Sequence, residues 1–469
     1  MSSDPFELER SEVGTAETNW ASAEDESGPV LDRTPGILGL AWPAVLGNLG
    51  FSLVGFVDIK IVGSMGPSAV AAVTTGNRLF WIVQAVLIAV TAGTTARVAR
   101  AWGAGDRLEA DRVTQASIVI CVVLAMVVTL PTFIFAPALA GIFDLDAKAT
   151  TGAVQFIRVL SLFNVAVAFN MAVGAGIRAA GDTMTPLWIG LLMNILNIFL
   201  VYALVYGRFG FPEMGIVGAA LANGLAFLAG GLLVAGLWLS RMLRIRYRRG
   251  ARSLQWHRVR SILKIGYPAG LEQAAMQLGF VIFLWLVAMY GTDPYAAYGI
   301  GVQILSFSFV VGSGFTIAAS THVGQSLGAG RPDLARASGW RAVVWASASM
   351  LLLGGIIVFF ARPIASFMIQ DPEVIQLTVL FIYILGAVQP LMAIEFTLGG
   401  ALRGAGDTHY PFITTLIGLV GVRGTVAACA VWWGLEVGWV FGALIFDYAV
   451  KASLLILRFR SGRWIRAVA

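Results

Sequence analysis

The side chains best suited to chemistry in this sequence are a few acids and amides inside long apolar segments. Asp58 stands in the apolar stretch 36–63, and no other carboxylate of the first half lies as deep in such a segment. Burial disfavours the charged form of a carboxylate, so a buried one readily takes up a proton or a cation. Asp58 is therefore a candidate proton- or cation-binding group, with a buried hydrogen-bond acceptor as the structural alternative.

Three asparagines are candidates for the same site. Asn194 and Asn197 are three residues apart and so share one face of a helix, and Asn223 lies in the next apolar stretch. Such amides often only join membrane helices, but we assign these to the Asp58 network. Lys60 points to another face than Asp58, and it either extends to the lipid headgroups or faces a cavity.

The second half contains its own charged residues within apolar stretches. Asp447 and Lys451 are four residues apart, which predicts an ion pair along one helix. Glu272 has no evident partner on its own stretch, and both Glu272 and Glu395 are either structural or functional. The candidate cavity residues are Lys60, Asn170, Glu272, Gln273, Glu395 and Asp447.

A proline precedes Asp58 on the same apolar stretch. Pro43 lies some four helical turns before it, and a proline inside a helix removes a backbone hydrogen bond and permits a bend. We therefore expect Pro43 to act as a hinge.

These residues must be positioned by membrane helices. The chain is 58% hydrophobic and only 12% charged, against about 25% charged in soluble domains. Spanning a bilayer takes roughly 20 mostly apolar residues. Twelve stretches qualify: 36–63, 73–96, 113–136, 153–175, 186–206, 215–239, 265–290, 297–321, 342–361, 374–398, 411–433 and 437–457.

The chain repeats itself at an offset of 225 positions. The segment GIRAAGDTMTP at 176–186 returns as ALRGAGDTHYP at 401–411, and Pro43 returns as Pro268. Six stretches per half give both halves the same orientation, which predicts an all-α protein of two parallel six-helix lobes around a central site. In the repeated loops we expect Arg178 to pair with Asp182, and Thr185 to cap the following helix.

Basic residues predict the orientation. The connections 97–112, 176–185, 241–264, 322–341, 399–410 and 458–466 hold 22 Lys and Arg, whereas the opposite connections hold Lys148, Arg208 and Arg362. Positive loops remain in the cytosol, so we expect a multi-pass protein of the cell membrane with both termini cytosolic.

This pattern divides the chain into five parts. Residues 1–35 form an acidic tail expected to be disordered, and 241–263 form a basic linker on anionic headgroups rather than a nucleic-acid-binding arm. The lobes are 36–240 and 264–460, followed by a cytosolic tail at 461–469. Cys121 and Cys429 are expected to pack, with no disulfide or metal site.

Motifs for enzyme chemistry are missing from the sequence. It has no Walker motif, no GxSxG and no cluster of histidines. We therefore expect no enzymatic activity, no cofactor and no bound metal, apart from a coupling proton or sodium ion.

The ordered motifs resemble one known family. VDIKIVGSMG (57–66), TGN (75–77), GAGD (103–106), the two GDT loops and GIVGAALAN (215–223) resemble the multidrug and toxic compound extrusion (MATE) transporters over residues 35–460, and most of all their DinF-like branch. The resemblance implies a V of two lobes that opens to either side in turn. It also implies antiport of small organic compounds, often cationic, against protons or sodium. We expect a monomer in the lipid bilayer without a nucleic-acid partner.

The resemblance can be carried to single residues. Asp58 matches the family's first-helix carboxylate and Asn197 its fifth-helix asparagine, while Asn223 stands where DinF-like members usually have threonine. Val201 stands where many relatives have aspartate. One acid fewer favours proton over sodium coupling, through Asp58.

Three other functions fit part of the pattern. A lipid-linked oligosaccharide flippase of the related superfamily would use the same V shape. Lys60 and Arg423, two bases within the apolar stretches, leave this alternative possible. A major-facilitator-type carrier also has six plus six helices, but GAGDRLEADR is a poor match to its usual loop. A membrane enzyme would need histidines or acids gathered at one membrane face, which the sequence lacks.

Overall fold

The structure is a computed structural model that describes residues 34–247 and 254–466, and all regular elements in these ranges are helices. The predictions for residues 1–33, 467–469 and the middle of the basic linker lie outside the described residues.

The first lobe holds α2 to α9. Its bounds are α2 (Ile37–Gly63), α3 (Pro67–Gly103), α4 (Arg107–Ile134), α5 (Ala136–Gly141), α6 (Ala147–Ser161), α7 (Asn164–Ala179), α8 (Met184–Tyr206) and α9 (Gly215–Leu239).

The second lobe holds α10 to η3. Its bounds are α10 (Trp256–Ala288), α11 (Thr292–Gly328), α12 (Pro332–Phe359), α13 (Ala361–Met368), α14 (Pro372–Ala405), α15 (His409–Thr415), the π-helix η2 (Leu416–Arg423), α16 (Gly424–Trp432), α17 (Val437–Ser461) and the short 3-10 helix η3 (Arg463–Arg466).

Twelve membrane spans are present if one broken span is counted. Eleven segments are long and apolar enough on their own, and α6 and α7 form the twelfth with a bend of 53° between them. The protein is therefore a multi-pass membrane protein. The stretch 153–175 was expected to be one helix, and this expectation is corrected. The break lies at 162–163, where the ring of Phe163 fills the space that a side chain at Gly224 of α9 would need.

The sequence starts equivalent helices of the two lobes in the same way. Asp146 accepts a hydrogen bond from the backbone nitrogen of Ala149 at 2.8 Å and caps α6. Its partner in the repeat, Asp371, accepts from Glu373 and Val374 and caps α14. A side-chain oxygen at this position satisfies backbone donors that the first turn leaves free.

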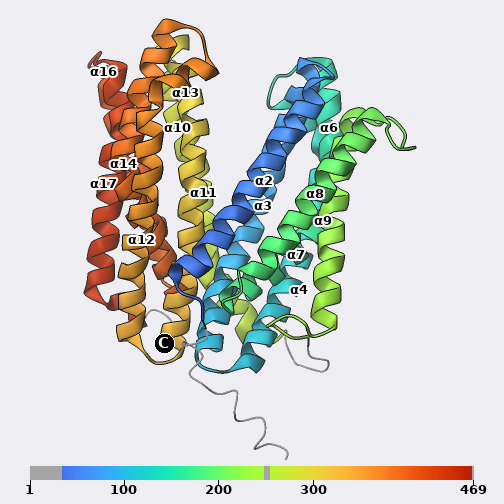
Figure 1. Ribbon diagram of the computed structural model, residues 1–469, viewed down its shortest axis with the longest axis vertical. Coiled ribbons are helices and arrows are strands. Elements are labelled where there is room, and N and C mark those ends of the chain that lie inside the picture. The colour runs from blue at the N-terminus through green and yellow to red at the C-terminus, as the bar shows by residue number, and fades with distance from the viewer. Residues whose placement is uncertain (1–33, 248–253, 467–469) are drawn as a thin grey trace, which may run out of the picture.

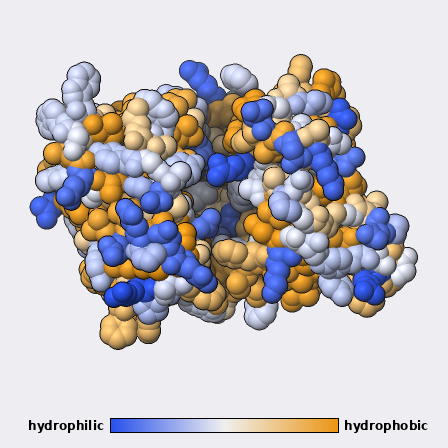
Figure 2. All heavy atoms as spheres, turned by 90° about the horizontal axis from the view of Figure 1, so that it is seen from above, coloured by the Kyte–Doolittle hydropathy of each residue, from blue (hydrophilic) through white to orange (hydrophobic). Residues whose placement is uncertain are grey.

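The two lobes form a V (Figure 1). They meet at the end where α2 begins and α11 finishes, which we call the closed end, and they separate toward the opposite, open end. Viewed from the open end, the surface is hollowed between the lobes (Figure 2). The start of α2 crosses to the other lobe, where Ile37, Leu40 and Ala41 join its apolar core.

The repeat is also a repeat in space. At the closed end a side chain at Gly103 would collide with the carbonyl oxygen of Gln325, and one at Gly328 would collide with that of Arg100. Adding 225 to one contact gives the other, as a two-fold axis between α3 and α11 requires. Both helices run from the open to the closed end, so the axis runs along them and the repeat is parallel, as predicted.

Hydrogen bonds reinforce the closed end between the lobes. The Asn48 amide donates to the hydroxyl of Ser313 at 2.8 Å. Gln325 donates to the carbonyl of Ala179 at 2.8 Å and accepts from Thr34 at 2.9 Å. These bonds join α2 and the first GDT loop to α11, so opening this end requires them to break.

The repeated loops correct two local expectations. Asp182 accepts from both the backbone nitrogen and the hydroxyl of Thr185, at 2.9 and 2.7 Å. Asp182, not Thr185, therefore supplies the oxygen that caps the start of α8. No ion pair joins Asp182 to Arg178 among the residues that the structure describes. The carboxylate is turned toward the helix start, where backbone donors are free.

Candidate coupling site

Asp58 lies inside the first lobe, near the open end of α2. Only 5% of its surface is exposed. The Asn223 amide of α9 donates to Oδ2 of Asp58 at 3.1 Å, and it also donates to the carbonyl of Ala219 in its own helix. The predicted contact between Asp58 and Asn223 is therefore present. It joins α2 to α9 through two residues that are 165 positions apart in the chain.

Among the residues that the structure describes, the second oxygen of Asp58 has no partner. Oδ1 of Asp58 and Oδ1 of Asn197 are both buried and accept no hydrogen bond. No ion pair to Asp58 occurs within the described ranges. A buried carboxylate oxygen that is neither hydrogen-bonded nor paired is costly unless a proton or a cation reaches it.

The other two amides do not bond to Asp58. Asn197 is buried on α8, and its side-chain carbonyl oxygen accepts no hydrogen bond from the described residues. The amide nitrogen of Asn194 faces Gly50 of α2, 3.0 Å from the position that a Cβ atom would take there. Gly50 lies about two helical turns before Asp58, so Asn194 is away from the acid. Val201 packs in an apolar cluster with Val62 of α2. The site is thus a single acid and an amide beside an apolar wall.

The candidate cavity residues of the first lobe have different surroundings. Lys60 is exposed near the end of α2. Asn170 donates to the carbonyls of Ala166 and Phe227 and so joins α7 to α9, which is a structural contact. Pro43 is buried inside α2, which continues through it.

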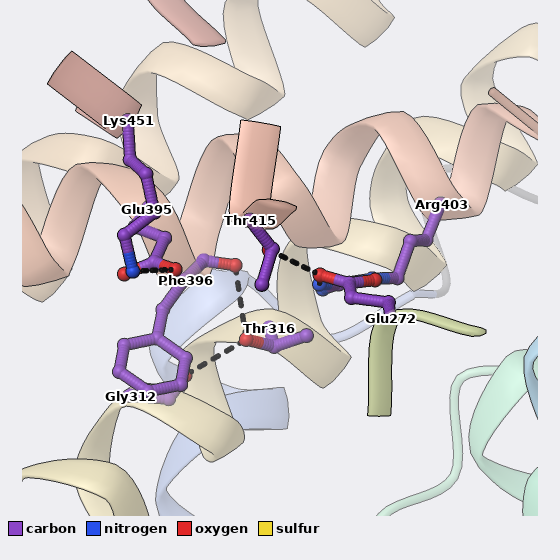
Figure 3. A network of polar contacts seen from close by, with 8 residues as sticks. All are labelled: Glu272, Gly312, Thr316, Glu395, Phe396, Arg403, Thr415 and Lys451. Atoms are coloured by element: carbon purple, nitrogen blue, oxygen red, sulfur yellow. Dashed lines mark hydrogen bonds and ion pairs between the residues drawn. The ribbon is translucent and has the colours of Figure 1, made fainter. Parts of the chain in front are cut away.

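The second lobe holds a network of buried and partly buried ion pairs (Figure 3). Glu272 of α10 pairs with Arg403 of α14 at 2.5 Å and accepts a hydrogen bond from the hydroxyl of Thr415 at 3.0 Å. Glu395 of α14 pairs with Lys451 of α17 at 2.9 Å. Gln273, beside Glu272, is half-buried and has no contact in this network.

The network continues along α17. Lys451 also pairs with Asp447 at 3.3 Å, which confirms the predicted pair. Asp447 in turn pairs with Arg423 at the end of η2, and neither side chain is exposed by more than 2%. Three acids thus match three bases: Glu272, Glu395 and Asp447 with Arg403, Lys451 and Arg423.

Sequence reasoning found the acids but missed the partner of Glu272. The partner is Arg403 of the second GDT loop, which is 131 positions away. The repeat contained a signal, because the position equivalent to Glu272 is Gly47 in the first lobe. The arginine is present in both loops, as Arg178 and Arg403, whereas the acid is present only in the second lobe. This difference indicates an ion pair that forms in the second lobe alone.

We expect Glu272→Gln to destabilise the protein by about 2–5 kcal/mol, because it leaves Arg403 partly buried without its counter-ion. Arg403→Gln should have a similar effect. The double variant Glu272→Gln/Arg403→Gln should be closer to wild type than either single variant in a thermal unfolding measurement in detergent. Singles and double with equal melting temperatures would contradict the ion pair's structural role.

The fold and this arrangement define a class of protein. Two parallel six-helix lobes enclose a hollow that opens to one side, and the interior of one lobe contains a buried acid that pairs with no base among the described residues. This is the architecture of a secondary transporter that works by alternating access.

Comparison with known proteins identifies the family. The MatE family model matches twice, at residues 43–203 and 268–428, which together make up more than half of the chain. The protein therefore belongs to the MATE family of transporters.

Individual relatives are similar over nearly their whole length. A probable multidrug resistance protein NorM of Thermotoga maritima is 32% identical, over 91% of this chain and 92% of its own. The multidrug resistance protein PmpM of Pseudomonas aeruginosa is 25% identical, over 87% and 83%. A solved structure described as the outward-facing conformation of a multidrug resistance MATE family transporter has a TM-score of 0.86 at 21% identity, over 92% of this chain and 96% of that one.

Proposed function

We propose that this protein exports small organic compounds in exchange for protons that bind Asp58. The observation that carries the proposal is the buried Oδ1 of Asp58, which has neither a partner nor a second acid beside it in the described part of the first lobe. The names of the relatives support multidrug export.

The exchange follows from competition for one charge. An ionised Asp58 attracts organic cations in the hollow, and its charge is more stable in a polar environment. Protonation removes the charge, leaves Asn223 with a weaker acceptor and permits α2 to bend at Pro43. Substrate and proton then disfavour each other's binding, which is the requirement for antiport.

Proton coupling is favoured over sodium coupling by the local chemistry. Asp58 and Asn223 supply few oxygen ligands, and the apolar Val201 occupies the next helical turn after Asn197. A sodium ion needs several oxygen ligands, whereas a proton needs only the free Oδ1. The carboxylates of Glu272, Glu395 and Asp447 in the interior of the second lobe are already paired with bases.

The flippase alternative is not favoured. Arg423 is one of the two bases that supported this alternative, and it pairs with Asp447 in the interior of the second lobe. A base that is 2% exposed does not present its charge to a lipid-linked phosphate in the hollow.

The test is export of ethidium from sealed proteoliposomes without added nucleotide. A proton gradient alone should drive export, and a sodium gradient alone should not. Export driven only by sodium would overturn proton coupling, and failure of both gradients would overturn the antiport mechanism.

We also propose that the closed end of this structure faces the cytosol, because the basic connections lie there. In a protein without native cysteines, Ile142→Cys and Thr292→Cys at the open end should react with an impermeant thiol reagent added to intact cells. Asp333→Cys at the closed end should react only after the membrane is opened. Labelling of the last variant in intact cells would reverse the orientation.

A further inference from the structure

The place equivalent to Asp58 in the second lobe holds no acid. Helices α2 and α10 correspond at the offset of 225, since Pro43 matches Pro268 and the turns that follow them contain Gly66 and Gly291 with the same φ of 102°. By this correspondence Phe283 stands in the second lobe where Asp58 stands in the first.

A guanidinium group packs against this phenylalanine. The charged carbon of Arg423 lies 5.5 Å from the ring centre of Phe283 and 5.5 Å from that of Tyr448. Asp447 pairs with the same guanidinium, and its carboxylate is completely buried. Two aromatic faces and a carboxylate form a cage that binds a cation well, and here the cation belongs to the chain.

A local distortion of the helix brings this cation into the cage. Leu416–Arg423 is a π-helix that ends at Arg423. The equivalent segment of the first lobe, residues 191–198, is ordinary α-helix within α8. π-helical turns are rare and occur mostly at functional sites, and this one ends at the residue that supplies the cation.

The charges of the two lobes differ accordingly. The acids of the second lobe's network are matched one for one by bases, whereas Asp58 has no basic partner in the described part of the first lobe. In the second lobe each acid of the network already has a base beside it, so the network needs no further cation. Among the described residues of the first lobe Asp58 has no such base, so it can bind a proton or another cation.

We propose that Arg423 is a tethered cation that takes, in the second lobe, the place held by the exchangeable coupling ion in the first. Ion exchange is thereby restricted to Asp58, and the second lobe contains a latent cation site that opens when Arg423 is removed. The inference rests on the proposed coupling through Asp58, but its test does not require transport.

The test is thermal unfolding of the purified protein in detergent, with sodium chloride compared with choline chloride at two pH values. Wild type should be indifferent to sodium. Arg423→Gln leaves Asp447 and Glu395 with Lys451 as their shared base, beside the rings of Tyr448 and Phe283. Its melting temperature should fall by about 5 °C in choline and recover in sodium or at the lower pH.

The balanced variant Arg423→Gln/Asp447→Asn is the matched control. It removes one acid with one base, so it should be as indifferent to sodium and acid as wild type. Arg423→Lys keeps the charge and should also be indifferent. An Arg423→Gln protein that responds no more than the balanced variant would overturn the proposal.

A second comparison applies if Arg423→Gln does not accumulate. Asp447→Asn alone leaves an excess base, and its stability should be low and independent of sodium. Adding Arg423→Gln to it should raise the melting temperature, and a further decrease would overturn the proposal. If Asp58→Asn exports normally while Arg423→Gln gains a sodium response, the coupling role of Asp58 fails and the tethered cation stands.

Discussion

We expect Asp58→Asn to reach the membrane in normal amounts and to export about 10- to 100-fold more slowly under a proton gradient. The asparagine keeps the size of the side chain and can still bond with Asn223, so the fold should survive. It cannot gain or lose a proton, so the step that links the gradient to export is missing. The measurement is the initial rate of ethidium export from proteoliposomes at several pH values.

The control for this variant is Asp293→Asn, which neutralises an acid of the first turn of α11 at the open end. It changes the net charge equally and should export like wild type. If Asp58→Asn instead keeps the wild-type rate and pH dependence, Asp58 is a structural hydrogen-bond acceptor. The coupling group would then have to be sought among Glu272, Glu395 and Asp447.

A covalent link across the closed end should abolish export. Asn48 and Ser313 belong to different lobes, and their side chains are 2.8 Å apart. In a protein with Cys121 and Cys429 replaced by alanine, Asn48→Cys/Ser313→Cys should form a disulfide on oxidation. Alternating access requires these helices to separate, so export should stop on oxidation and return on reduction.

The matched control lies within one lobe. Gln389 of α14 donates to Ser308 of α11 at 2.7 Å, and both helices belong to the second lobe. Oxidised Ser308→Cys/Gln389→Cys should keep most of its export, because the link does not cross between the moving bodies. Equal inhibition by both links would mean that the lobes do not move as units, and full activity of the first would mean that the closed end does not open.

The overall design of this protein follows from its sequence. Apolar stretches of helical length, a repeat at a constant offset and basic connections on one side predicted two parallel lobes of membrane helices. These signals are strong because a bilayer requires every span to be long, apolar and internally hydrogen-bonded. Asp58 also stood out without a structure, since an acid in such a span is too costly to be incidental.

Tertiary structure decided which polar groups meet. The bond from Asn223 to Asp58 and the pair of Glu272 with Arg403 join helices far apart in the chain, and helical spacing says nothing about such partners. Helical spacing predicted only the pair of Asp447 with Lys451, because its two members lie one turn apart on one helix. The repeat was likewise visible at Pro43 and Pro268, but the packing of Arg423 against Phe283 was not. This packing depends on the π-helical turn η2, which places the guanidinium of Arg423 against the ring of Phe283. No residue type in the sequence predicts that turn.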